Sequence, residues 1–160
     1  MNIFFLDRDP IKAAQQHCDK HVVKMILETG QLLSTAHRLL DGDEYADRYG
    51  LYKVTHKNHP SAAWARANNN SYRWLYDMFI ALGEEYTYRY NKVHATIQKL
   101  RDPLSSSPWN SPQAFMSEPP QCMPDDVKAL DSVTAYRNYY RVYKAPILKY
   151  TRRASPEWLA

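Results

Sequence analysis

The fold of this chain is decided by one long stretch near its start, residues 9–40, which reads DPIKAAQQHCDKHVVKMILETGQLLSTAHRLL. Its apolar residues recur at steps of three and four, the period of an amphipathic α-helix. They are Ile11, Ala14, Cys18, Val22, Met25, Ile26, Leu33, Ala36 and Leu40. Asp9 suits the position before a helix, and Pro10 suits its first turn. We therefore expect one helix from Pro10 to about Leu40, which can bend at Gly30.

The rest of the chain also favours helices. We expect a short helix and a loop over 43–58, one or two helices over 61–100 with a break at 68–70, and a last helix from 132 to about 144. Residues 102–125 are rich in proline and predict an ordered loop without regular structure. The chain has only four glycines, too few for a many-stranded barrel or sandwich. The prediction is an all-α fold with one compact helical domain over 1–160, in which 131–160 form a basic and aromatic segment.

Composition narrows the class of protein. The chain has 160 residues, of which 44% are hydrophobic and 24% charged, and no apolar run approaches the roughly 20 residues that span a bilayer. The first residues, MNIFFLDRDP, lack the pattern of a signal peptide. We expect a cytoplasmic monomer that makes no membrane contact. Two cysteines are too few for a disulfide scaffold, so we expect free thiols.

A narrow polar stripe runs along the first predicted helix. At roughly 100° per residue its members fall within about 80° of one another. They are His17, His21, Lys24, Glu28, Gln31 and Thr35. Apolar residues border the stripe on both sides, with Val23 and Leu27 on one of them, which favours the floor of a cleft over a solvated face. Two other interpretations stay open. The stripe could hold surface ion pairs one turn apart, or His17 and His21 could bind a metal. No further ligand motif supports a metal, and we expect none.

This stripe resembles a pattern in the pyrimidine dimer DNA glycosylases, the phage endonuclease V-like family. Many members carry a basic residue, a Leu, a Lys, a Glu four residues after that Lys, and a Gln followed by two aliphatics. The corresponding residues here are Lys20 or His21, Val22, Lys24, Glu28, Gln31, Leu32 and Leu33. A second similar segment is Lys57-Asn58-His59-Pro60 with Arg66 behind it, and a third, weaker one is the basic and aromatic run 136–143. The resemblance covers about residues 1–95, and the Pro-rich loop has no counterpart.

The resemblance implies an all-α fold whose N-terminus lies between helices. It also implies that an α-amine attacks C1′ of a damaged nucleotide and that the resulting imine undergoes β-elimination, without a cofactor. A Glu on the first helix stabilises the sugar cation and moves protons, which assigns that role to Glu28. Because the second residue is Asn2, removal of Met1 is disfavoured, and the attacking amine is that of Met1 or the side chain of Lys24. We count His21, on the same stripe, among the catalytic candidates.

Several cationic and polar residues are candidates for binding nucleic acid. His59, before Pro60 at a helix start, can place an imidazole and free N–H groups at a phosphate. In the last helix, Arg137, Arg141 and Lys144 form an outward basic row, whereas the tyrosines between them have core spacing. The full set is His17, Lys20, Lys57, Asn58, His59, Arg66, Arg137, Arg141 and Lys144.

The sequence therefore predicts a DNA base-excision enzyme, a glycosylase with AP-lyase activity that acts on damaged or modified bases. Two alternatives stay open. The same scaffold could serve an enzyme that modifies RNA or free nucleotides, or a non-catalytic nucleic-acid-binding protein of phage type.

Overall fold

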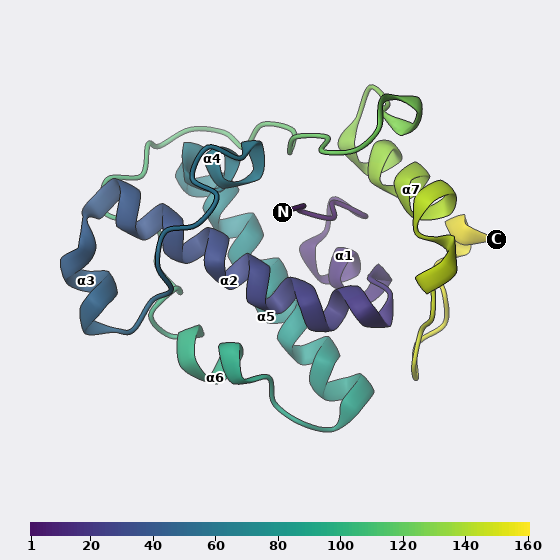
Figure 1. Cartoon of the computed structure of the whole chain (residues 1–160), viewed down its shortest axis with the longest axis horizontal. Helices are drawn as coiled ribbons and strands as arrows, with labels where there is room; N and C mark the ends of the chain where they lie inside the picture. The colour runs from purple at the N-terminus through teal and green to yellow at the C-terminus, as the bar shows by residue number, and fades with distance from the viewer.

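Two long helices, α2 and α5, cross at the centre of the computed structural model, which describes residues 1–160 (Figure 1). α1 packs on α5, and α4 packs on both long helices. α3 lies at one end of the molecule and α7 at the other (Figure 1). The helices are α1 (Pro10–Gln16), α2 (Asp19–Asp41), α3 (Asp43–Arg48), α4 (Pro60–Ala67), α5 (Asn69–Tyr90), α6 (Ala95–Leu100) and α7 (Ser132–Tyr143), with three short 3-10 helices, η1 (Asp125–Val127), η2 (Ala145–Ile147) and η3 (Glu157–Leu159). No strand is present, so the predicted all-α class is confirmed.

The helices begin where capping side chains predict. Asp9 accepts hydrogen bonds from the backbone N–H groups of the first turn of α1, and Asp131 does the same for α7. Asn68 caps α5, which confirms the break expected at 68–70. One hydrophobic cluster of 31 buried residues joins the helices and includes Ile3–Leu6 of the N-terminal segment. No helix combines the length and the apolar character that crossing a membrane requires.

The expected continuous helix over 10–40 is wrong at His17 and Cys18. Both residues have extended backbones, so α1 ends at Gln16 and α2 begins at Asp19. The backbone N–H of Cys18 donates to the Tyr140 hydroxyl at 3.3 Å, and that of Asp19 donates to the carbonyl of Lys149 at 2.8 Å. Partners from the C-terminal part of the chain thus replace the hydrogen bonds that a continuous helix would supply.

α2 continues through Gly30, where the sequence allows a bend, without a break. A Cβ at Gly30 would lie 3.0 Å from the Thr96 methyl of α6. The small residue therefore serves a close approach between two helices.

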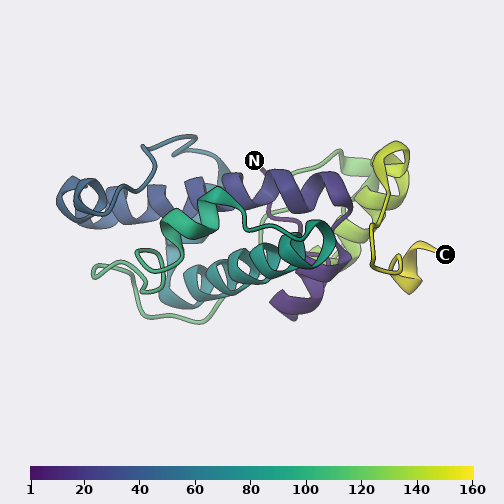
Figure 2. The same cartoon turned by 90° about the horizontal axis from the view of Figure 1, so that it is seen from below.

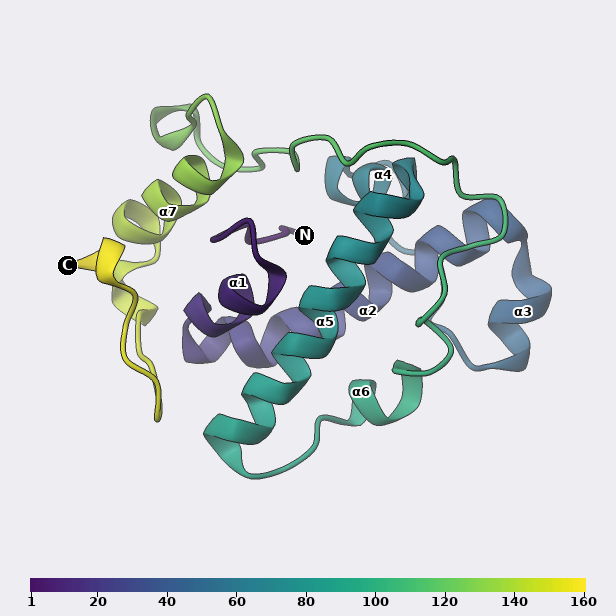
Figure 3. The ribbon, with the colours of Figure 1, turned by 180° about the vertical axis from the view of Figure 1, so that it is seen from behind.

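The Pro-rich loop follows the edge of the molecule from α6 past α4 to α7 (Figure 3). As predicted, it has no regular structure apart from turns. The side-chain amides of Asn68 and Asn70 donate to the carbonyls of Phe115 and Ala114. The Trp64 indole donates to the carbonyl of Ser117 at 3.0 Å. These contacts hold the loop in place against α4 and the start of α5.

Candidate active site at the N-terminus

The first residues of the chain lie between α2, α4 and α7. In two perpendicular views the N-terminus sits beside the middle of α2 (Figures 1 and 2). Ile3–Leu6 are buried, whereas Met1 and Asn2 are half-buried, so the chain reaches the surface only at its very start. The Phe4 ring stacks on His21 of α2 with ring centroids 4.2 Å apart. The N-terminal segment therefore covers the stripe at His21, where an open cleft was expected.

α4 and the Pro-rich loop enclose the N-terminus from the other sides. The Tyr136 hydroxyl donates to the carbonyl of Pro120 at 2.9 Å and lies 3.4 Å from Oδ1 of Asn2. The Cys122 Sγ lies 3.8 Å from the Ser61 Oγ at the start of α4. Both thiols, Cys122 and the buried Cys18, are free as predicted. Tyr136 thus links the Pro-rich loop to Asn2.

His59 connects the start of α4 with the N-terminal amine. Its Nδ1 accepts a hydrogen bond from the backbone N–H of Ser61 at 3.0 Å, so the imidazole caps α4 as a side chain. Burial lowers the pKa of His59, and the positive charge of the Met1 amine lowers it further. The Met1 amine and the His59 imidazole are therefore close enough to interact electrostatically.

Glu28 lies in the middle of α2 with 16% of its side chain exposed. Its Oε2 is buried and makes no hydrogen bond, and it lies 3.6 Å from the Lys24 Nζ one turn earlier. Lys24 itself has 70% of its side chain in solvent. Arg66, on α4, has a buried Nη1 that also lacks a hydrogen-bond partner. A buried polar atom without a partner is costly, so the hydrogen bonds of the folded chain leave these atoms of Glu28 and Arg66 unsatisfied. We call Met1, Lys24, Glu28, His59 and Arg66 the N-terminal site.

His17 and His21 do not offer the surface expected of them. His17 is fully buried, and its Nδ1 lies 2.6 Å from the carbonyl of Ala13. A nucleic-acid contact by His17 is incompatible with this burial. His21 is also buried, with its Nδ1 2.7 Å from the Tyr140 hydroxyl. Burial lowers the pKa of His17 to about 4 and that of His21 to about 3. Both are core histidines, and His21 positions Phe4 and Tyr140 and has no free ring face.

The basic row of α7 is only partly free. The Arg137 guanidinium donates to the carbonyl of Leu6 at 2.9 Å and pairs with Asp7 at 3.3 Å, so it holds the N-terminal segment. Arg141 is exposed, and its guanidinium lies over the Trp158 ring. Lys144 lies over the Tyr139 ring, and its charge is one of those that lower the pKa of His21.

The other residues predicted to bind nucleic acid or to lie in the core agree with the structure in part. Lys20, Lys57 and Asn58 are exposed, as a nucleic-acid contact requires. Tyr136 and Tyr140 are fully buried, as their spacing predicts. Tyr143 is exposed instead, and its hydroxyl donates to Asp126.

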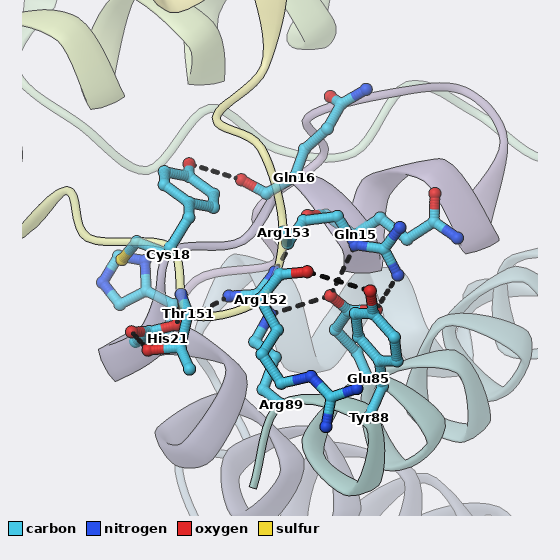
Figure 4. Close-up of polar contacts among 12 residues, drawn as sticks. Gln15, Gln16, Cys18, His21, Glu85, Tyr88, Arg89, Thr151, Arg152 and Arg153 are labelled. Atoms are coloured by element: carbon cyan, nitrogen blue, oxygen red, sulfur yellow. Dashed lines mark hydrogen bonds and ion pairs between the residues drawn. The ribbon is translucent and has the colours of Figure 1, made fainter.

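A buried network of charges, which the sequence patterns did not reveal, joins the C-terminal segment to α2 and α5 (Figure 4). Arg89 pairs with Asp19 at 3.0 Å and with Glu85 at 2.8 Å, and Arg153 pairs with Glu85 at 2.7 Å. Thr151 donates to Asp19 from its hydroxyl and its backbone N–H. Burial alone would raise the pKa of Asp19, but these hydrogen bonds outweigh it and lower the pKa. We call this cluster the C-terminal clamp.

No three His, Cys, Asp or Glu side chains gather as a metal site requires. The chain matches no family model, no curated protein and no solved structure. The chemistry of the N-terminal site therefore rests on its own geometry.

Proposed function

We propose that this chain is a DNA base-excision enzyme, a glycosylase with AP-lyase activity, whose nucleophile is the Met1 amine. The observation that carries the proposal is the burial of the first residues beside α2, the helix whose Glu28 carboxylate has a buried oxygen that lacks a hydrogen bond. An unpaired terminus normally projects into solvent, because fixing it costs conformational entropy. In this chain the N-terminal amine lies next to α2 and α4 despite this loss of conformational entropy.

The proposed chemistry needs a neutral amine and an acid–base group. The amine attacks C1′ of the nucleotide, the bond from C1′ to the base breaks, and the base leaves with a proton. The sugar opens to an imine between the amine nitrogen and C1′. Removal of a C2′ proton then expels the 3′ phosphate by β-elimination. Glu28 carries the protons and faces the positive charge that develops on the sugar.

Lys24 is the weaker candidate for the nucleophile. An amine side chain becomes nucleophilic when burial disfavours its charged form. Lys24 has 70% of its side chain in solvent, and its nearest charged partner is the Glu28 carboxylate. No surrounding group excludes water from the Lys24 amine. Its place favours a phosphate contact or an ion pair with Glu28.

Exposed cations beside the site suit a DNA backbone. Lys20 and Lys24 project from α2, Lys57 precedes α4, and Arg141 lies near the end of α7, where the half-buried Lys144 follows it. Lys24 and Lys144 both lie within electrostatic reach of His21. Cations thus lie on several of the elements around the N-terminus, and the whole chain has a formal net charge of +4.

The test is borohydride trapping on DNA that contains an abasic site. The proposal expects a covalent adduct between protein and DNA, because borohydride reduces the imine. Glu28→Gln keeps size and shape, so it is expected to keep the fold and lower turnover by roughly 10²- to 10⁴-fold.

Glu44→Gln is the matched control, because Glu44 also pairs with a cation one turn away, at 3.8 Å, but on the exposed α3. It should turn over at the parental rate. Absence of any adduct with abasic DNA, or parental turnover by Glu28→Gln, would contradict the proposal.

A further inference from the structure

A surface of hollows and exposed side chains lies on the side of α5 that faces away from α2. α5 lies in front of α2 in Figure 3 and behind it in Figure 1. Four hollows of about 170 to 570 Å³ follow one another along this side of α5, and no residue of the N-terminal site lines any of them. Each hollow shares lining residues with the next, so the four form one continuous surface, which we call the α5 face. The shared residues are Pro10, Ile11, Asn70, Asp77, Ala81, Glu84 and Phe115.

A single row of side chains from α5 runs along the middle of this face. Between Ser71 and Glu84, every residue of α5 is buried except the members of this row. They are Arg73, Asp77, Ile80 and Glu84. They follow one another at steps of four, three and four residues, so they lie along one line of the helix. The same spacing forms the seam by which one helix packs along another in coiled coils. The row is therefore suited to a second helix that lies along α5.

The charges of the row are poorly matched within the chain. Asp77 has only Arg73 as a partner, at 3.9 Å, and burial raises the pKa of Asp77 more than the charge of Arg73 lowers it. Glu84 makes no ion pair within the chain. Two apolar side chains of the same face, Ile11 and Phe115, are 55% and 94% exposed. The carboxylates disfavour a nucleic acid, whose phosphates they repel, and the mixture of charges and apolar side chains is typical of a protein interface.

We propose that the α5 face binds a second copy of this chain, with the two α5 helices antiparallel about a two-fold axis midway between Asp77 and Ile80. Arg73 and Glu84 are equally far from this axis along the helix, so Arg73 of each copy lies opposite Glu84 of the other. The cation at one end of the row thus matches the anion at the other, which makes the row complementary to itself. From Asn69 to Tyr88 the face is about 28 Å long at 1.5 Å per residue, and a square patch of that edge has roughly the 800 Å² that a standard interface buries on each partner.

This inference does not rest on the proposed function, because it concerns different side chains and association without turnover. The test is sedimentation equilibrium of the whole chain from about 1 to about 100 µM, the range in which a dimer with a micromolar Kd dissociates. We expect the mass to rise with concentration toward twice the 18.8 kDa of one chain. Arg73→Glu and Glu84→Arg should each weaken association by about tenfold or more, because a reversed charge meets a like charge twice in a symmetric dimer.

An equimolar mixture of these two variants separates the proposed contact from damage to the fold. In the mixed dimer each reversed charge lies opposite the reversed charge of the other copy, so both ion pairs form again with opposite signs. We therefore expect the mixture of Arg73→Glu and Glu84→Arg to associate with about the parental affinity, although neither variant does so alone. A variant that had merely lost its fold would gain nothing from the mixture.

Residues outside the α5 face provide the matched controls. Glu44→Arg reverses an exposed glutamate on α3 and should leave association unchanged. Ile11→Ser should weaken association, whereas Val93→Ser should not, since Val93 is as exposed as Ile11 but lines none of the four hollows. The proposal is overturned if the chain stays a monomer at every concentration, as the sequence alone leads us to expect. It is also overturned if the mixture of the two charge-reversed variants stays monomeric, or if the controls lose affinity as much as the variants of the α5 face.

Discussion

The C-terminal clamp and the N-terminal site bury polar groups in opposite ways. In the clamp, Asp19, Glu85 and Arg89 are buried, and each is bonded to at least two partners. In the N-terminal site, Glu28 and Arg66 each bury a polar atom that makes no hydrogen bond. Leaving such an atom unpaired costs roughly 1–3 kcal/mol. A fully paired cluster stabilises the folded state, whereas the proposed function assigns the unpaired groups of the N-terminal site to ligand binding.

The largest expected effect is on the clamp. Arg89→Met removes the cation between Asp19 and Glu85 and leaves two buried carboxylates without it, so the free energy of unfolding should fall by about 3–5 kcal/mol. Urea or guanidinium denaturation measures this. Arg48→Met is the control, since Arg48 makes a single exposed pair with Glu44 and should change the free energy of unfolding by less than about 1 kcal/mol. Equal losses for the two variants would remove the distinction between a structural clamp and a surface pair.

The next largest expected effect is a loss of folding stability at low pH. His17 and His21 have pKa values lowered to about 4 and about 3, well below the ordinary value of 6.5. Between these pKa values the unfolded chain binds protons that the folded chain does not bind. The free energy of unfolding therefore falls as the pH drops below about 6.5. At roughly 1.4 kcal/mol per pH unit, each histidine should cost about 2 kcal/mol between pH 6.5 and pH 5.

Denaturation curves at these two pH values check the sign. His21→Phe keeps a ring against Phe4 and should halve the loss on acidification. The exposed His56, replaced in His56→Asn, should leave it unchanged. A stability that rises on acidification would show that the two histidines are not buried as neutral rings.

Glu28→Gln should have a small effect on stability, which sharpens the comparison. The substitution removes a carboxylate whose buried Oε2 has no hydrogen bond and gives up only one ion pair to a lysine in solvent. We expect the free energy of unfolding to change by less than about 1 kcal/mol, with the amide tolerated as well as the acid. A loss on the scale of Arg89→Met, in the same denaturation experiment, would mean that Glu28 is a structural group.

The smallest effects concern DNA binding. Arg137 contacts the N-terminal segment, whereas Arg141 and Lys144 do not. Replacing Arg141 and Lys144 by Met should therefore leave the fold intact. The slope of log K against log salt for duplex DNA should become shallower by about 0.9 for each phosphate that the double variant no longer neutralises. Lys53→Met, an exposed lysine outside the expected DNA-binding set, is the control. An unchanged slope for the double variant would place the DNA on another face.

Local signals in the sequence were sufficient for the helix starts, because Asp9, Asn68 and Asp131 cap through their own neighbours in the chain. They failed at His17 and Cys18, where Tyr140 and Lys149 supply the hydrogen bonds that replace a helix. The clamp was missed for the same reason, since Asp19, Arg89 and Thr151 come from separate segments. Spacing could place Glu28 and Lys24 on one face of a helix. It could not reveal that Phe4 of the N-terminal segment packs on His21 of the same helix, or that Glu28 is mostly buried while Lys24 is exposed.

The most direct test of the N-terminal site is to find which amine carries the sugar. After borohydride reduction on abasic DNA and digestion of both the DNA and the protein with nuclease and trypsin, mass spectrometry locates the residual adduct. The structure predicts the added mass on the N-terminal peptide, residues 1–8, and none on Lys24, because the buried segment holds the Met1 amine in place and Lys24 stays in solvent. Acetylation of the N-terminal amine should abolish the adduct. An adduct on Lys24, or one that persists after this acetylation, would contradict the assignment of Met1.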